Sequence, residues 1–558
     1  MSSVVPGVVR EPAGAGAWSG VRSAVNRWSV ALTAAALYCV GLVAQLTAAV
    51  IVNQPLSEGS SYYVAVARNL VEGHGLVINA MWSYATPPLV LPRPAFELWQ
   101  PMASFVAAVP MSLMGTSFDA AQIGFAFLGA LLAPLAWLVA RDAARQLALP
   151  ERRAQSVTLG AGVLTAISAP LLLAGAAPDS TLPFAVAGVC ACLLVPRAVG
   201  GSRAALVGVG VALGVAYLTR MEAVWLGVAF VAAAYLATRS IRRAAVLGAS
   251  AAIVAALIAA PWWLRNLSVF GTPLPGQLAD NAFLTRNEQI FAYLDRPTLG
   301  GFLAQGPATI AGNIGAAFWH NLVDVLVVPA GAIAAIGLLT VLIGLRRRGV
   351  RPVGALAVLL GAGALTYVAT SVLFPVATLW GTFEHAAGPL DVGLIVAAAI
   401  GADAFVARVR EWRSWPRANA WLAPAGLALI GLPIAALALA GAAASANADA
   451  QRIHVFGADL SSQPVLTCAG CDGPYITDRP VWLSDATHHS AIALPDESAA
   501  SIAQLARDFR ATYVVVTQPR NDLPAALRAP EAQACFKELH LPGQPAQSAV
   551  FRVNEACR

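Results

Sequence analysis

The residues best suited to carry chemistry lie in one polar stretch directly after the first long apolar run. Glu58 stands there within Ser-Glu-Gly-Ser-Ser (57–61), and Gly73-His74-Gly75 follows. Serines favour the start of a helix and glycines its end, so the pattern predicts a short helix over about 61–72. Glu58 then lies at or just before the first turn, where the helix dipole favours the charged, basic carboxylate. The pattern indicates a functional acid; a solvated loop acid is the ordinary alternative.

The rest of the chain has the composition of a helical membrane protein. Of its 558 residues 58% are hydrophobic and 11% charged, and the mean hydropathy is +0.67, whereas soluble proteins carry about 25% charged residues. A shorter apolar segment at 101–115 predicts an interfacial helix. The longer apolar runs predict about eleven transmembrane helices, at 29–52, 118–140, 154–175, 181–196, 204–219, 222–238, 244–264, 320–345, 352–375, 390–406 and 419–444.

The distribution of arginine orients these spans. With the N-terminus inside, twenty arginines fall in cytoplasmic segments and six in the outer loops that precede the C-terminal region. This bias follows the positive-inside rule. An odd number of spans then places the C-terminus outside, so we expect a multi-pass protein of a bacterial plasma membrane with an extracytoplasmic C-terminal domain.

We therefore predict an all-α polytopic membrane protein with a small C-terminal extracytoplasmic α/β domain. Residues 1–28 are expected to form a disordered cytoplasmic tail, 29–444 the transmembrane domain with outer loops at 53–117 and 265–319, and 445–558 a separate soluble domain after a short linker. Strand-like runs in that domain lie at 464–468, 512–517 and 548–553, and an amphipathic helical pattern lies at about 497–509.

This topology gathers polar side chains on the outer face. Each has an ordinary alternative, such as a local ion pair, an interface anchor or a hydrogen-bonded loop histidine. Their convergence on one face favours a common site. In addition to Glu58, Arg68 and His74 of the first outer loop, they are Asp179, Arg220, Glu222, Arg265, Asn266, Glu384 and His385.

Several short motifs follow one another along the chain in an order that indicates a protein family. They are Glu58, Tyr62-Tyr63, Ala67–Leu70, Gly73–Gly75, Trp99–Pro101, Pro261–Pro275 and Gly381–Phe383. This order resembles the GT-C superfamily of integral-membrane glycosyltransferases, in particular the bacterial branch similar to dolichyl-phosphate-mannose protein mannosyltransferases. The resemblance spans about residues 50–450. It implies a GT-C-like fold, a polyprenyl-phosphate sugar donor, and an acceptor hydroxyl on a glycan, lipid or protein at the outer face.

The sequence departs from the family pattern at the acid. The family usually has aspartate, often in an acidic pair, where this chain has the single Glu58 between Ser57 and Gly59. Either the longer side chain of Glu58 places its carboxylate where the family has that of aspartate, or Asp179 or Glu97 acts as the base, or the acceptor differs from the usual ones of the family.

The chemistry that the resemblance implies needs a base and cations. We expect Glu58 to take the acceptor's proton and Arg265 with Arg220 to hold the donor phosphate, since guanidinium binds phosphate oxygens in pairs. Inversion at the sugar is expected. The remaining candidates for positioning substrate are Arg68, His74, Tyr62, Asn266, Glu222, Asp179, His385 and Glu384. We expect no cofactor or metal, because the membrane region shows no compact set of metal-ligating residues.

Four cysteines lie in the C-terminal domain. An oxidising outer compartment favours disulfides. Cys535 and Cys557 bracket a predicted hairpin and are expected to pair, and Cys468 could then pair with Cys471. A zinc site formed by Cys468 and Cys471 with His488 and His489 is the alternative.

Two other function classes stay open. A transporter or lipid flippase would show an internal repeat with polar residues at mid-span, and the sequence shows neither. A catalytically inactive GT-C relative in envelope assembly is the second, because of the unusual acid.

Overall fold

The computed structural model describes residues 15–276, 278–323, 331–347, 353–415, 419–462, 473–518, 523–545 and 547–557. The helices of the membrane region are α1 (Ala15–Ile51), α2 (Glu58–Val71), α3 (Met102–Met114), α4 (Phe118–Ala130), α5 (Leu132–Gln146), α6 (Glu151–Ala166), α7 (Ala169–Ala176), α8 (Thr181–Val199), α9 (Arg203–Tyr217), α10 (Ala223–Thr238), α11 (Ile241–Phe270), α12 (Leu278–Ala282), η1 (Asn287–Phe291), α13 (Leu299–Ala304), α14 (Pro307–Leu322), α15 (Gly331–Arg347), α16 (Ala355–Leu373), η3 (Ala377–Trp380), α17 (Thr382–Ala386), α18 (Gly388–Arg413) and α19 (Leu422–Ser462). The C-terminal domain adds α20 (Pro480–Thr487), α21 (Ala499–Phe509), α22 (Leu523–Arg528) and η4 (Glu555–Cys557).

Each predicted span has a helical counterpart, but fewer than eleven helices are long enough to cross a membrane alone. Seven of the described helices or helix pairs are long and apolar enough, or eight if the bent pair α6–α7 is one span. The predicted spans at 204–219 and 222–238 correspond to α9 and α10, of 15 and 16 residues. These are shorter than the roughly 20 residues that a perpendicular crossing needs. Part of the predicted span 320–345 lies outside the described residues.

The helix α2 forms where the polar stretch predicted it, but it begins three residues earlier. Ser57 is its N-cap, and the Ser57 hydroxyl accepts a hydrogen bond from the Ser60 amide at 3.1 Å. Glu58 therefore lies in the first turn. Gly73 follows the helix with φ +85°, a backbone conformation that glycine adopts without strain.

A six-stranded sheet joins the loop between α2 and α3 to the C-terminal domain. Its order is β2-β5-β4-β6-β8-β7, with β2 through β6 parallel and β8 antiparallel to both neighbours. The strands are β2 (Ala80–Met81), β4 (Tyr475–Thr477), β5 (Ala491–Ala493), β6 (Tyr513–Val516), β7 (Phe536–Leu539) and β8 (Ala549–Val553); β1 (Val77–Ile78) pairs separately with β3 (Arg93–Pro94). The domain that we expected to be separate is thus completed by an edge strand from residues 80–81.

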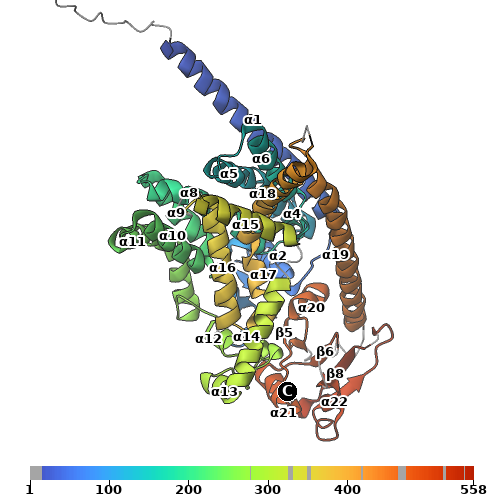
Figure 1. Ribbon diagram of the computed structural model, residues 1–558. Helices are drawn as coiled ribbons and strands as arrows, with labels where there is room; N and C mark the ends of the chain where they lie inside the picture. Colours follow the sequence, from blue (N-terminus) through green and yellow to red (C-terminus); the bar gives the residue numbers. More distant parts are fainter. Residues whose placement is uncertain are drawn as a thin grey trace, which may run out of the picture.

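The long helix α19 connects the two halves of the molecule. It has 41 residues, about 62 Å at 1.5 Å per residue, and Figure 1 shows it running from the membrane helices to the C-terminal sheet. Its last turns belong to the core of the C-terminal domain, where buried Phe456 and Leu460 pack with Tyr475 and Leu483. The short linker predicted after residue 444 is therefore helix. The tail predicted as disordered is also helical from Ala15 onward.

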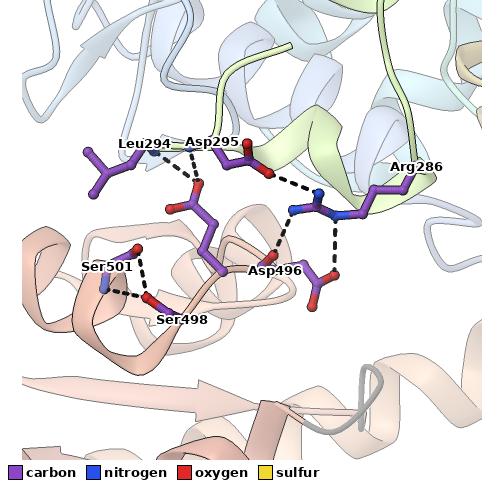
Figure 2. Close-up of a pocket in the computed structure, with 7 residues that line it drawn as sticks. Arg286, Leu294, Asp295, Asp496, Ser498 and Ser501 are labelled. Atoms are coloured by element: carbon purple, nitrogen blue, oxygen red, sulfur yellow. Dashed lines mark hydrogen bonds and ion pairs between the residues drawn. The ribbon is translucent and has the colours of Figure 1, made fainter. Parts of the chain in front are cut away.

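The second outer loop also docks on the C-terminal domain, through the junction in Figure 2. Arg286 bridges the Asp295 carboxylate at 2.9 Å and the Asp496 carbonyl at 3.1 Å. One oxygen of Glu497 accepts backbone amides from Tyr293, Leu294 and Asp295 at 2.7–3.1 Å. The charged groups of this hollow bond one another and the backbone, which indicates a structural joint.

The predicted cysteine pair forms in the structure. Cys535 and Cys557, which are 22 positions apart in the sequence, are joined by a disulfide. The disulfide closes a loop and should stabilise the domain by about 3 kcal/mol. Cys468 and Cys471 lie outside the described residues.

Candidate active site

A cavity of about 610 Å³ lies where the ends of the membrane helices meet the C-terminal domain. Five of the sequence-predicted residues line it, and they come from four separate places in the chain. Glu58 begins α2, Asp179 precedes α8, Arg220 and Glu222 lie in the turn between α9 and α10, and His385 lies in α17. These five of the residues that were predicted to converge therefore meet at one cavity, and the others do not line it.

Glu58 is buried and bonded to the C-terminal domain. Its two carboxylate oxygens accept the backbone amides of Val481 at 2.9 Å and Trp482 at 3.1 Å, at the start of α20. Burial raises the pKa of Glu58 to about 7, because desolvation outweighs the two amides and the nearby Arg479, which favour the charged form. The result is a carboxyl group that exchanges its proton near neutral pH.

Two further bonds hold α2 against α20. The indole N–H of Trp482 donates to the Ser61 hydroxyl at 2.5 Å. Arg68, a predicted substrate-binding residue, instead forms an ion pair with Asp485 of α20. Arg68 is not among the residues that line the cavity, so its role in the structure is to join the two elements.

A second polar cluster also lines the cavity. The Asp179 carboxylate lies 3.3 Å from Nδ1 of His385 and accepts the Ser180 hydroxyl at 2.8 Å. Although burial alone raises the pKa of Asp179, His385, Ser180 and Arg220 together lower it. Asp179 therefore stays ionised and holds His385 in place.

The guanidinium of Arg220 is already bonded at both terminal nitrogens. One donates to the Ser180 hydroxyl at 2.8 Å, and the other to Glu222 at 2.7 Å and to the Thr382 carbonyl at 3.3 Å. Glu222 neutralises its charge. Arg220 thus lines the cavity as one half of a partly buried ion pair.

Aromatic rings form much of the cavity wall. Trp99 contacts Trp82 at 5.1 Å between ring centroids, Trp82 contacts Phe291 at 4.7 Å, and Phe291 contacts Trp380 at 5.5 Å. Such rings combine a large apolar face with defined geometry. A row of them beside carboxylates suits a ring-shaped ligand that has apolar C–H faces and polar edges.

Arg265 lies outside the cavity, contrary to its predicted role as a phosphate holder. Its guanidinium stacks on the rings of Trp262 at 4.9 Å and Phe270 at 5.1 Å, and donates to Asn266 at 3.1 Å. Asn266 is itself buried and donates to the Pro273 carbonyl at 3.4 Å. Both residues organise the end of α11.

Tyr62 and Glu97 are also used within the fold. The Tyr62 hydroxyl accepts the Phe96 amide at 2.6 Å and lies 3.5 Å from Glu97. Glu97 forms a buried ion pair with Arg93 at 3.2 Å and does not line the cavity. This geometry makes Glu97 a poor alternative base.

His74 and Glu384 are likewise not among the cavity-lining residues. The His74 side chain is exposed and lies 3.7 Å from Glu72. Glu384 precedes His385 in α17, and its side chain approaches Gly381.

Sequence reasoning missed the contribution of the C-terminal domain. Asp478, Arg479 and Trp482 line the cavity and follow strand β4. The sequence feature that could have indicated this contribution is the segment Tyr-Ile-Thr-Asp-Arg-Pro (475–480), in which a strand ends and proline begins a helix. Polar residues at the carboxyl end of a parallel strand are common ligand-binding positions. Within the described residues, no group of three or more His, Cys, Asp or Glu side chains is arranged to hold a metal ion.

Comparison with solved structures identifies the fold. ArnT from Cupriavidus metallidurans bound to undecaprenyl phosphate aligns with a TM-score of 0.51 and 15% identity, over 94% of this chain and 98% of that one. The chain has the GT-C fold. Apo ArnT aligns at 0.49 and 15% identity, over 96% and 99% of the two chains. The Archaeoglobus fulgidus oligosaccharyltransferase aligns at 0.46 and 13%, over 92% of this chain and 76% of that one.

The GT-C fold agrees with the predicted all-α membrane architecture and its small strand-containing C-terminal region. No protein-family model matches the chain, and no curated protein matches it. The GT-C fold is therefore shown by the three-dimensional arrangement.

Proposed function

We propose that the protein is a membrane glycosyltransferase that moves a sugar from a polyprenyl-phosphate donor to an acceptor hydroxyl on the outer face of the plasma membrane. The observation that carries this proposal is the position of Glu58. It is a buried carboxyl with a pKa of about 7 on an aromatic-walled cavity of the GT-C fold. The product belongs to a cell-envelope glycan, glycolipid or glycoprotein.

The reaction needs one proton acceptor. The acceptor oxygen attacks the anomeric carbon and loses its proton to Glu58, while the bond from that carbon to the phosphate oxygen breaks and the phosphate leaves with the electron pair. Attack opposite the leaving group inverts the sugar. Each Glu58 oxygen accepts one backbone amide, which leaves further lone pairs for the acceptor hydroxyl.

Glu58 is a better base than Asp179. A general base works best when its pKa is near the working pH, and the pKa of Glu58 is about 7, whereas that of Asp179 is lowered. We assign Asp179 and His385 to substrate positioning. The fit of a polyprenyl phosphate is supported by the ArnT structure, which was solved with undecaprenyl phosphate bound.

The test is sugar transfer by purified protein in nanodiscs. Radiolabelled polyprenyl-phosphate sugars and envelope-derived acceptors would be supplied to the wild type, Glu58→Gln, Asp179→Asn and Glu72→Gln. Glu72 caps the same helix but lies away from the cavity, so its variant is the matched control. We expect Glu58→Gln to lose about 10²- to 10⁴-fold in rate and Glu72→Gln to keep wild-type activity.

The other outcomes separate the alternatives. Transfer that survives Glu58→Gln but not Asp179→Asn moves the base to Asp179. Binding of the lipid phosphate with no transfer from any donor favours the inactive relative. Movement of the lipid across the bilayer without transfer favours a flippase.

A further inference from the structure

The donor phosphate needs a cation in the cavity, and the arginines predicted from the sequence do not provide one that is free. Arg220 is neutralised by Glu222 and is bonded at both terminal nitrogens. Arg265 lies outside the cavity and stacks on two rings. The leaving phosphate could bind the Arg220 guanidinium only after the hydrogen bonds of Arg220 to Ser180, Glu222 and Thr382 were broken.

Arg479 of the C-terminal domain differs from Arg220 and Arg265 in its contacts. It lines the cavity and its guanidinium stacks 5.1 Å from the ring centroid of Trp482. Within the described part of the chain, its guanidinium makes no hydrogen bond and no ion pair. Stacking occupies the face of a guanidinium and leaves its N–H edge open, and that edge is the part that binds phosphate oxygens in pairs.

The neighbouring acids accept hydrogen bonds from other groups or pair with another arginine, and in the part of the chain that the structure describes none of them forms an ion pair with Arg479. Asp478 accepts the Thr517 amide at 2.8 Å, the Thr517 hydroxyl at 3.0 Å and the Gln518 amide at 3.1 Å. Glu58 accepts the two amides of α20. Asp449, which also lines the cavity, pairs with Arg452 at 3.5 Å.

We propose that Arg479 binds the phosphate of the polyprenyl-phosphate donor, so that the C-terminal domain completes the active site. This rests on the proposed function. Arg479 and Glu58 both line this cavity, and Glu58 is close enough for the arginine to act on its charge. The base and the phosphate-binding cation thus both reach the cavity when α20 docks on α2.

The test is lipid binding to the full-length protein in nanodiscs. Undecaprenyl phosphate and undecaprenol share the chain and differ in the phosphate, so the ratio of their affinities isolates the phosphate contact. Inorganic phosphate would be added as a competitor to show whether the site prefers a lipid-linked or a free phosphate. The proteins would be the wild type, Arg479→Gln, Arg479→Lys and Arg507→Gln.

Arg507 is an exposed arginine of the same domain, so Arg507→Gln controls for loss of one positive charge. We expect the wild type to bind undecaprenyl phosphate about 10- to 100-fold more tightly than undecaprenol, the range for a charge-assisted hydrogen bond. Arg479→Gln should abolish this preference, Arg479→Lys should keep part of it, and Arg507→Gln should keep all of it. Unchanged thermal unfolding of the ligand-free variants would show that they fold.

A preference for the phosphate that persists in Arg479→Gln would overturn the inference, and so would a wild type with no preference. The transfer assay is independent of this result. Transfer by both the wild type and Arg479→Gln at equal rates would leave the enzyme proposal standing and refute the phosphate site. Lost phosphate preference in Arg479→Gln without transfer by the wild type would support the site and refute the enzyme.

Discussion

Glu58 is held by backbone amides that lie 423 and 424 positions later in the chain. Two opposing effects act on its proton. The amides and Arg479 stabilise the carboxylate, and burial stabilises the neutral acid more strongly, which raises the pKa to about 7. An exposed glutamate with an ordinary pKa would be fully ionised but a weaker base. The surroundings of Glu58 therefore raise the basicity of its carboxylate and also fix the position of that carboxylate.

This pKa predicts the pH dependence of the reaction. The base must be deprotonated to act, so kcat/KM should rise as the pH increases through about 7 and level off above it. The measurement is kcat/KM for sugar transfer between pH 5 and 9, with Glu72→Gln as the control that keeps the profile. A rate that is constant between pH 5 and 8 would show that Glu58 is not the titrating base.

At the same scale, the sequence was informative about residue types and uninformative about side-chain directions. Serine and glycine at the ends of α2 placed Glu58 correctly, because capping is local chemistry. Arg265 and Arg220 looked equivalent as arginines at outer helix ends. Their difference depends on which neighbour each side chain meets, Trp262 for one and Glu222 for the other, and that is decided by packing between distant segments.

Among the elements, β2 has only two residues but a large effect on the architecture. Two residues of the first outer loop extend the sheet of the C-terminal domain, and Met81 is fully buried in the core beneath it with Ile476, Ile492 and Val514. A two-residue strand has no periodicity to detect in a sequence, which is why the C-terminal domain was expected to be independent. The same joint places α20 over Glu58.

Met81→Ala should loosen this joint. Removing a buried methionine side chain typically destabilises a core by about 2–5 kcal/mol, so the amides of β5 should exchange with solvent faster and the outer domain should unfold at a lower temperature. Hydrogen exchange followed by mass spectrometry measures both regions at once. Val90→Ala, at an exposed position of the same loop, is the control, and equal exchange in the two variants would contradict the structural role of β2.

For the whole molecule, the predicted orientation can be tested by labelling. The cavity and the C-terminal domain should face the outside, and the end of α18 the cytoplasm. In intact cells, a membrane-impermeant maleimide should react with Arg507→Cys and spare Arg408→Cys, both at exposed positions. Lysed cells provide the control, because both sites should then react. The reverse pattern would place the cavity inside and remove the outer-face acceptor.

The helix α19 fixes how the C-terminal domain is rotated about the helix axis relative to the membrane helices. It runs without a break from the membrane helices into the core of the C-terminal domain, and successive residues of an α-helix differ by about 100°. One residue inserted into its middle would turn Phe456 and Leu460 by that angle and lift them by about 1.5 Å. The sheet and α20 would then lose their alignment with α2. The number of residues in α19 is thus as strict a requirement as the identity of any side chain in the cavity.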